Sequence, residues 1–173
     1  MKIRSVIIMM LLIDHSVQAC SCLRDWSSPQ ERLLKEYKSA DAIVLATAVE
    51  VKPRDKNEEQ AKIINKYWIE NTTFKLIGRW KGNIDTQFET SILVGRGMCG
   101  IQFQQGETYL LYLYKKRDGH LYSTSICQKN RNLVDAEKDV RLMEKIPQYP
   151  AESNAIFWRE LARKSHKDAT KHR

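Results

Sequence analysis

Four cysteines constrain this chain more than any other feature, because two lie close together near its start and two lie far along it. They are Cys20, Cys22, Cys99 and Cys127. A disulfide between Cys20 and Cys22 would close a very small, strained ring, so we set that pairing aside. Each of the two remaining pairings ties the N-terminal segment to two distant places. In the chain-entropy model, closing so long a loop stabilises the folded state by roughly 4 kcal/mol.

The segment before the first cysteine is typical of a secretory signal. Lys2 and Arg4 form a positive n-region, a short apolar run follows, and residues 17–19 place small or aliphatic side chains where a signal peptidase reads them. The sequence therefore predicts a signal peptide over residues 1–19 and a secreted chain that begins at Cys20. An even number of cysteines behind such a signal indicates disulfides. A four-cysteine zinc site, the rival interpretation, lacks the usual C-x₂-C spacing and histidine partners.

Hydrophobic patterning predicts a mainly β fold with flanking helices. Five segments rich in β-forming residues recur along the chain, over residues 42–51, 67–77, 88–94, 107–115 and 120–125. The Asp118-Gly119 dipeptide between the last two is a strong hairpin signal. Five strands suit a small closed β-barrel of the OB type, whereas a β-sandwich would normally need about seven. The predicted architecture is therefore a five-stranded OB-type closed barrel whose N-terminus is held by disulfides.

Helix signals lie on both sides of the predicted strands. Residues 28–31 carry a capping box with proline at the first helical position, so a helix should begin there and end near Ser39. Apolar residues recur near a 3.6-residue period over 132–146, with Asn132 as a possible cap. A last amphipathic helix is expected over 153–165. These elements predict a barrel domain over residues 20–147 and a basic helical tail over 148–173.

The charge of the chain favours acidic partners. The formal net charge is +8, and cations are frequent in the tail, at Arg159, Arg163, Lys164, Lys167, Lys171 and Arg173. Such a tail could contact a sulfated glycan or an anionic surface, although a solvated basic end is the simpler interpretation. We expect no transmembrane segment, because no stretch approaches the ~20 apolar residues that span a bilayer.

The sequence offers little for catalysis or for nucleic-acid binding. Of the four histidines, only His120 falls in the predicted barrel, while His15 lies in the signal and His166 and His172 lie in the charged tail. No H-E-x-x-H, G-x-S-x-G or glycine-rich phosphate loop is present. We therefore expect neither an enzyme nor a bound cofactor. Aromatic strand residues could stack on bases, but secretion and disulfides argue against a nucleic-acid partner.

Short motifs around the cysteines are the most specific signal. They are Cys20-Ser21-Cys22 at the predicted mature N-terminus, Met98-Cys99-Gly100, Ser125-Ile126-Cys127, and the segments ADAIVLATAV and FKLIGRWKG. Together they resemble the netrin-like module and, more narrowly, the N-terminal inhibitory domain of tissue inhibitors of metalloproteinases, over roughly residues 20–146. The resemblance implies disulfides Cys20–Cys99 and Cys22–Cys127. The third disulfide of that domain and the cysteine-rich C-terminal domain of the family are missing here.

The resemblance also implies a function, inhibition of a zinc metalloprotease. A catalytic zinc keeps an open position for water, and the free α-amino group and backbone carbonyl of Cys20 would chelate it and displace that water. The amine must be neutral to donate, so binding should depend on pH near an α-amino pKa of about 8. The implied protease-binding ridge comprises Cys20, Ser21, Cys22 and Leu23 beside Gly97, Met98 and Cys99. The zinc would belong to the protease, with Ser21 directed toward the pocket for the residue after the scissile bond.

Two alternatives remain open from the sequence. The same fold serves in binding modules that inhibit nothing, so an extracellular netrin-like module is the first. The second is a lipid-anchored or periplasmic envelope protein, because a cysteine directly after a signal is also where bacterial lipoproteins are lipidated. A lipidated Cys20 could neither form a disulfide nor chelate zinc. The sequon Asn71-Thr72-Thr73 would carry a glycan only in a eukaryotic secretory pathway.

Overall fold

The computed structural model describes residue 22 and residues 25–53, 67–95, 98–117, 121–145 and 151–171. Its strands are β1 (Ala42–Pro53), β2 (Tyr67–Lys81), β3 (Gln87–Gly95), β4 (Thr108–Lys115), β5 (Tyr122–Ser123) and β6 (Arg131–Asn132). Its helices are α1 (Pro29–Ser39), α3 (Glu137–Glu144) and α4 (Ala151–Lys171).

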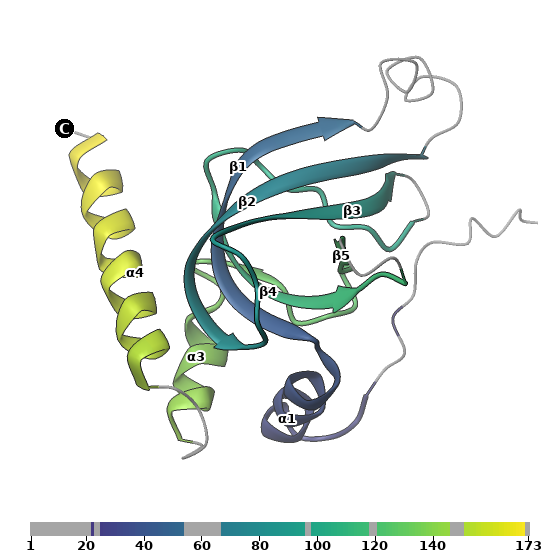
Figure 1. The fold of residues 1–173 in the computed structure, drawn as a ribbon. Coiled ribbons are helices and arrows are strands. Elements are labelled where there is room, and N and C mark those ends of the chain that lie inside the picture. Colours follow the sequence, from purple (N-terminus) through teal and green to yellow (C-terminus); the bar gives the residue numbers. More distant parts are fainter. Residues whose placement is uncertain are drawn as a thin grey trace, which may run out of the picture.

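Strand β1 closes the sheet into a barrel, because it pairs antiparallel with β2 along one edge and with β4 along the other. The order around the barrel is β1-β2-β3-β5-β4 (Figure 1). Strands β3 and β5 pair in parallel, and the short β6 pairs with β4. The β1–β2 register shifts between Ile43 and Val44, between Leu45 and Ala46, and between Ala48 and Glu50. Such irregularities bend a strand, as closure requires. The prediction of a closed five-stranded OB-type barrel is confirmed.

Strand β1 is buried on both faces, which explains why its sequence alternates only in part. Ala42, Val44 and Ala46 point into the barrel, whereas Ile43 and Leu45 point outward under the helices. A strand covered on both faces is apolar at consecutive positions. The run AIVLA therefore belongs to two separate cores.

Aromatic side chains fill the interior of the barrel. Phe74 stacks on Phe88 with ring centroids 5.4 Å apart, and Phe103 meets the edge of Phe74 at 4.9 Å. Tyr109 continues the cluster, 5.0 Å from Phe103, and its hydroxyl accepts a hydrogen bond from the backbone N–H of Gln104 at 2.9 Å. Edge-to-face and offset contacts of this kind add to the area that the rings bury. The aromatic strand residues here thus serve as core.

The first helix begins where the sequence predicts. Glu31 N–H donates to Ser28 Oγ at 3.2 Å, and Ser28 N–H donates to Glu31 Oε2 at 2.7 Å, so both halves of the capping box are present. The hydrogen bonds from Ser28 hold the pKa of the Glu31 carboxyl below its usual value. The helix ends at Ser39 and buries Leu33 completely against the outer face of the barrel.

The prediction that Asn132 caps a helix is wrong. Asn132 lies in β6, where it pairs with Tyr109 of β4, and Leu133 N–H then donates to the carbonyl of Thr108 at 2.8 Å. The Asn132 side chain accepts from Asp135 N–H at 2.8 Å and so caps a turn, while α3 begins only at Glu137. The periodicity of apolar residues predicted a helix here, but the backbone of residues 131–133 makes its hydrogen bonds to β4 and Thr108 instead.

Two other elements differ in length from their predictions. The fifth strand comprises only Tyr122–Ser123 within the residues that the structure describes, and β2 continues to Lys81. The Asn71 sequon lies inside β2, where Asn71 is half-buried and registers with Lys52 of β1 and Ser91 of β3.

The basic C-terminal segment is a helix packed on the barrel. Helix α4 runs beside the strands (Figure 1), and its Phe157 is completely buried. Trp80 Nε1–H donates to Asn154 Oδ1 at 2.8 Å, and a Cβ on Gly78 would lie 3.3 Å from Ile156 Cγ2. Helix α4 therefore contacts the FKLIGRWKG segment at Gly78 and at Trp80.

Some of the cations on α4 are already paired. Arg163 forms an ion pair with Glu160, and Lys164 forms one with Glu107 of the barrel. None of the helices in the described part of the chain has both the length and the apolar character needed to cross a membrane. The partnership with a glycan or an anionic surface stays a prediction.

We expect Phe157→Ala to lower the free energy of unfolding by about 3–5 kcal/mol, because it would empty a fully buried aromatic site between α4 and the barrel. Urea denaturation followed by circular dichroism would measure the change. Arg159→Ala, at an exposed position on the same helix, should change the value by less than about 0.5 kcal/mol. A loss below about 1 kcal/mol in Phe157→Ala would show that α4 contributes little to the folded unit.

Candidate functional site

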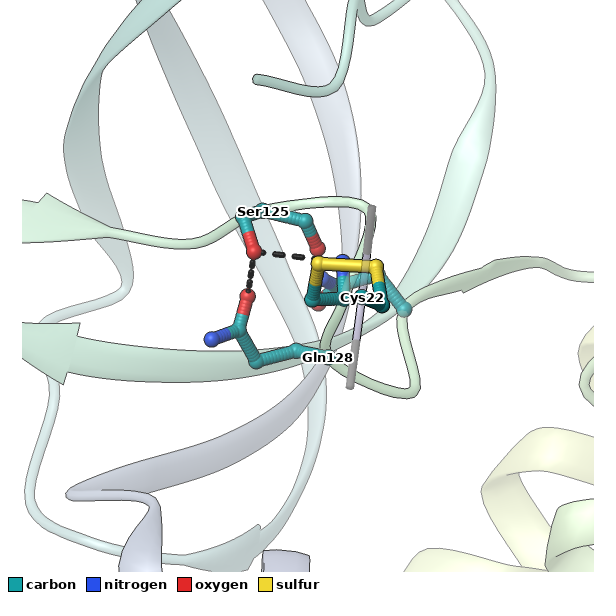
Figure 2. The surroundings of a disulfide bond; sticks show 5 residues. Cys22, Ser125 and Gln128 are labelled. Carbon is teal, nitrogen blue, oxygen red and sulfur yellow. Dashed lines mark hydrogen bonds between the residues drawn. A yellow bond between two sulfur atoms is a disulfide. The ribbon is translucent and has the colours of Figure 1, made fainter. Parts of the chain in front are cut away.

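A disulfide between Cys22 and Cys127 anchors the N-terminal segment to the loop between β5 and β6. The two Cα atoms lie 5.3 Å apart although 105 residues separate them in the chain (Figure 2). This is the pairing that the family resemblance implies for these two cysteines. The bond fixes Cys22 to the barrel.

The loop that carries Cys127 is held by local hydrogen bonds. Ser125 Oγ accepts from the backbone N–H of Cys127 at 3.2 Å and donates to Gln128 Oε1 (Figure 2). A short hydroxyl that bonds its neighbours' backbone stabilises a tight turn. The anchor for Cys22 is therefore a structured turn.

Beneath this turn, Asn130 ties the loop to strand β4. Its side chain is buried, accepts from Tyr112 N–H at 2.8 Å, and donates to the carbonyl of Ser125 at 2.8 Å and to Thr124 Oγ1. The Thr124 hydroxyl in turn donates to the carbonyl of Tyr112 at 2.8 Å. Because buried amides without partners are costly, this closed set of bonds selects one loop conformation.

An ion pair supports the same loop from helix α3. Lys129 Nζ lies 3.3 Å from Asp139 Oδ1, and the two side chains are only 15% and 11% exposed. Removing either partner would leave the other charge poorly solvated, so the pair holds loop and helix together.

The second cysteine segment lies beside the first. Ile126 N–H donates to the carbonyl of Cys99 at 2.8 Å, which places the Met98–Gly100 segment against the loop that carries Cys127. Cys99 is itself disulfide-bonded. Gly100 is required by close approach to β3, because a Cβ there would lie 2.1 Å from the carbonyl oxygen of Leu93. Two segments that are remote in sequence therefore share one edge of the barrel.

The ridge residues predicted from the sequence divide into two groups. Cys22 and Cys99 are exposed and Met98 is half-buried, and the Cys22 and Cys99 segments meet at the same loop. The remaining four, Cys20, Ser21, Leu23 and Gly97, lie outside the described residues, as does the predicted signal over 1–19.

The segment between Cys22 and α1 is fixed by Asp25. Its carboxylate accepts from Ser27 N–H at 2.9 Å and from Ser27 Oγ–H at 2.6 Å, and it pairs with Lys35 of α1 at 3.1 Å. These bonds, those from Ser27 foremost, hold the pKa of the Asp25 carboxyl well below its usual range. The carboxylate thus joins the segment after Cys22 to helix α1.

Helix α1 is in turn bonded to β4. The Tyr114 hydroxyl donates to Glu36 Oε2 at 2.7 Å and lies 3.2 Å from Ser39 Oγ. Burial, together with the neighbouring Glu36 carboxylate, raises the pKa of Tyr114 to about 12. The N-terminal segment is therefore supported by the barrel through α1 as well as through the disulfide.

Sequence reasoning missed the residues that make this site rigid. Asn130 and Ser125 carry no motif of their own, and their roles depend on contacts with β4 and with Gln128. It also missed Trp26, which is 81% exposed four residues after Cys22. An isolated tryptophan before a helix cap gives no periodic signal that would distinguish a surface anchor from a core residue.

No family model matches this chain, and no curated protein matches it either. Among the described residues, no group of three or more histidine, cysteine, aspartate or glutamate side chains could hold a metal ion.

We expect Asn130→Ala to lower the free energy of unfolding by about 2–3 kcal/mol, since it leaves the buried N–H of Tyr112 without its acceptor. It should also speed amide hydrogen exchange at Ile126 and Cys127, which NMR would measure residue by residue. Asn83→Ala, at an exposed position, is the matched control and should leave both quantities almost unchanged. Unchanged exchange at Ile126 in Asn130→Ala would mean that the amide does not hold the loop.

Proposed function

We propose that this chain is a secreted metalloprotease inhibitor, in which the free amine and carbonyl of Cys20 chelate the catalytic zinc of the target protease. The observation that carries the proposal is the Cys22–Cys127 disulfide, which joins the N-terminal segment to a loop that is itself bonded to the Cys99 segment. Inhibition by a chain terminus needs such an anchor, because a free terminus would lose its conformational entropy on binding.

The proposal is supported by the short stretch of chain between the proposed chelating residue and this anchor. Cys20 precedes Cys22 by two residues, and a chain advances at most about 3.6 Å per residue, so the two Cα atoms lie within about 7 Å of each other. Both cysteines of this disulfide, Cys22 in the N-terminal segment and Cys127 in the loop, are exposed. In this proposal, a protease at the Cys22–Cys127 disulfide also contacts Cys20, Ser21 and Met98.

The proposed chemistry requires an unmodified N-terminus. A neutral amine and a carbonyl oxygen on the same residue can form a five-membered chelate and take the position of the zinc-bound water. Without that water the protease lacks its nucleophile. Ser21 would follow into the pocket for the residue after the scissile bond, where its small hydroxylated side chain is easily placed.

Secretion is part of the same proposal. It is supported by the signal-like segment over 1–19 and by the disulfide-bonded state of Cys22, Cys99 and Cys127, since disulfides persist in oxidising compartments. A netrin-like module that docks a partner without inhibiting it is the alternative, and the test below separates the two.

The decisive comparison is between protein that begins at Cys20 and protein with one extra alanine before Cys20. We expect the first to inhibit at least one member of a panel of zinc metalloprotease catalytic domains stoichiometrically. The extension should raise the inhibition constant by at least about a hundredfold, because the Cys20 nitrogen becomes an amide that cannot donate to zinc. Inhibition titrations with a fluorogenic peptide substrate would measure both.

An extra alanine at the C-terminus serves as the matched control and should not change inhibition. If both N-terminal forms inhibit equally, chelation by Cys20 is wrong. If neither inhibits any protease while both fold with intact disulfides, the binding-module alternative replaces the inhibitor. The mass of the N-terminal peptide from the secreted protein tests the lipid anchor, since an acylated Cys20 contradicts the proposal.

A further inference from the structure

A groove lies beside the Cys22–Cys127 disulfide. Its walls come from the segment after Cys22, from the first turns of α1 and from residues 126–131, and its volume is about 1170 Å³. Small-molecule pockets usually measure about 300–1,000 Å³. The groove is therefore large enough for a short stretch of polypeptide, and every lining residue belongs to the described part of the chain.

Two large apolar side chains are exposed in this groove. Trp26 is 81% exposed and Ile126 is 49% exposed, and they line it from different segments. Trp26 follows Cys22 closely in the sequence, and Ile126 immediately precedes Cys127, so the disulfide holds both segments together. Exposed apolar side chains that gather in a hollow, with a tryptophan among them, are typical of binding surfaces.

Two of the cations that line the groove are already paired with carboxylates. Lys35 is paired with Asp25, and Lys129 with Asp139. Glu36, the remaining carboxylate of the lining, accepts a hydrogen bond from the Tyr114 hydroxyl, which is neutral and does not cancel its charge. Among the described lining residues, two unpaired guanidinium groups therefore stand against one unpaired carboxylate, and the balance is positive.

Two guanidinium groups that line the groove keep most of their hydrogen-bond donors available. Arg32 donates to the backbone carbonyl of Asp25 at 3.3 Å, and Arg131 donates to the backbone carbonyl of Asn130 at 2.7 Å. Neither has a carboxylate partner among the residues that the structure describes. Each guanidinium carries five N–H donors in a fork that matches a carboxylate, so most donors of both remain available.

We propose that this groove binds an extended acidic segment of a partner protein. An apolar side chain of that segment lies on Trp26 and Ile126, and its carboxylates bind Arg32 and Arg131. Charge complementarity selects an acidic partner, and the apolar contacts favour a polypeptide over a sulfated glycan, which brings no aliphatic side chain for Ile126. In the inhibitor, the acidic segment belongs to the target protease; this last identification rests on the proposed function.

A peptide-binding experiment tests the groove without any protease. The probe is a dye-labelled synthetic peptide in which glutamates flank a central leucine, and fluorescence anisotropy follows its binding to the oxidised protein that begins at Cys20. We expect saturable binding that Arg131→Glu and Ile126→Ser each weaken by at least about tenfold. Raising the salt concentration should weaken it as well.

The controls separate the groove from general basicity. Arg159→Glu makes the same charge change on α4, outside the groove, and should leave peptide binding almost unchanged, and a peptide with lysines in place of the glutamates should not bind. The proposal is overturned if no saturable binding occurs or if Arg159→Glu weakens binding as much as Arg131→Glu. It is also overturned if a sulfated oligosaccharide binds with the dependence on Arg131 and Ile126 and the acidic peptide does not.

The two proposals fail separately. Protein with an extra alanine before Cys20 should bind the peptide as well as protein that begins at Cys20, since the groove does not include the amine. Peptide binding without inhibition would support the proposed peptide-binding groove and contradict the proposed inhibitor function. If inhibition depends on the free amine but is unchanged in Arg131→Glu, the groove does not bind the target protease.

Discussion

Strand β1 is the constraint on which the rest of the structure depends. Its first half is hydrogen-bonded to β2 along one edge and to β4 along the other, and that half is buried on both faces. Closure of this kind removes the exposed edges that an open sheet would present. It also brings the loop after β5 and the segment after β3 side by side. There the Cys127 loop and the Cys99 segment are hydrogen-bonded to each other.

The candidate site is rigid because several independent interactions meet at one short loop. The disulfide from Cys22, the amide of Asn130 and the ion pair from Asp139 each reach residues between Thr124 and Asn130. Opening of the loop must break the hydrogen bonds of Asn130 and the Lys129–Asp139 ion pair while the disulfide still limits how far the loop can move. A surface that binds through a chain terminus needs such support, since binding energy otherwise goes into ordering the terminus.

Helix α4 shows how local sequence can understate a tertiary role. Its charges suggest a solvated tail, yet Phe157 is fully buried and Lys164 pairs with Glu107 of the barrel. The outer face of the barrel around Trp80 carries apolar residues that need a cover, and α4 supplies it. The helix therefore contributes to the fold of the barrel and is placed on a different part of it from the groove beside α1.

Much of the fold could be predicted from the sequence. The capping box at Ser28 and the β-rich segments are local signals, and each specifies its structure without reference to distant residues. The even set of cysteines predicts disulfides, but their pairing depends on the fold. The start of α3 could not be predicted, because Asn132 satisfies its backbone against β4. The residues that support the site could not be predicted either, because Asn130 stabilises the loop only through its hydrogen bonds with Tyr112 and Ser125 in the folded chain. By itself the sequence determined most of the strands, the first helix and the exclusion of a Cys20–Cys22 bond. Only the tertiary structure decided which exposed side chains, Trp26 and Ile126 among them, lie together around the disulfide, because closure of the barrel sets those distances.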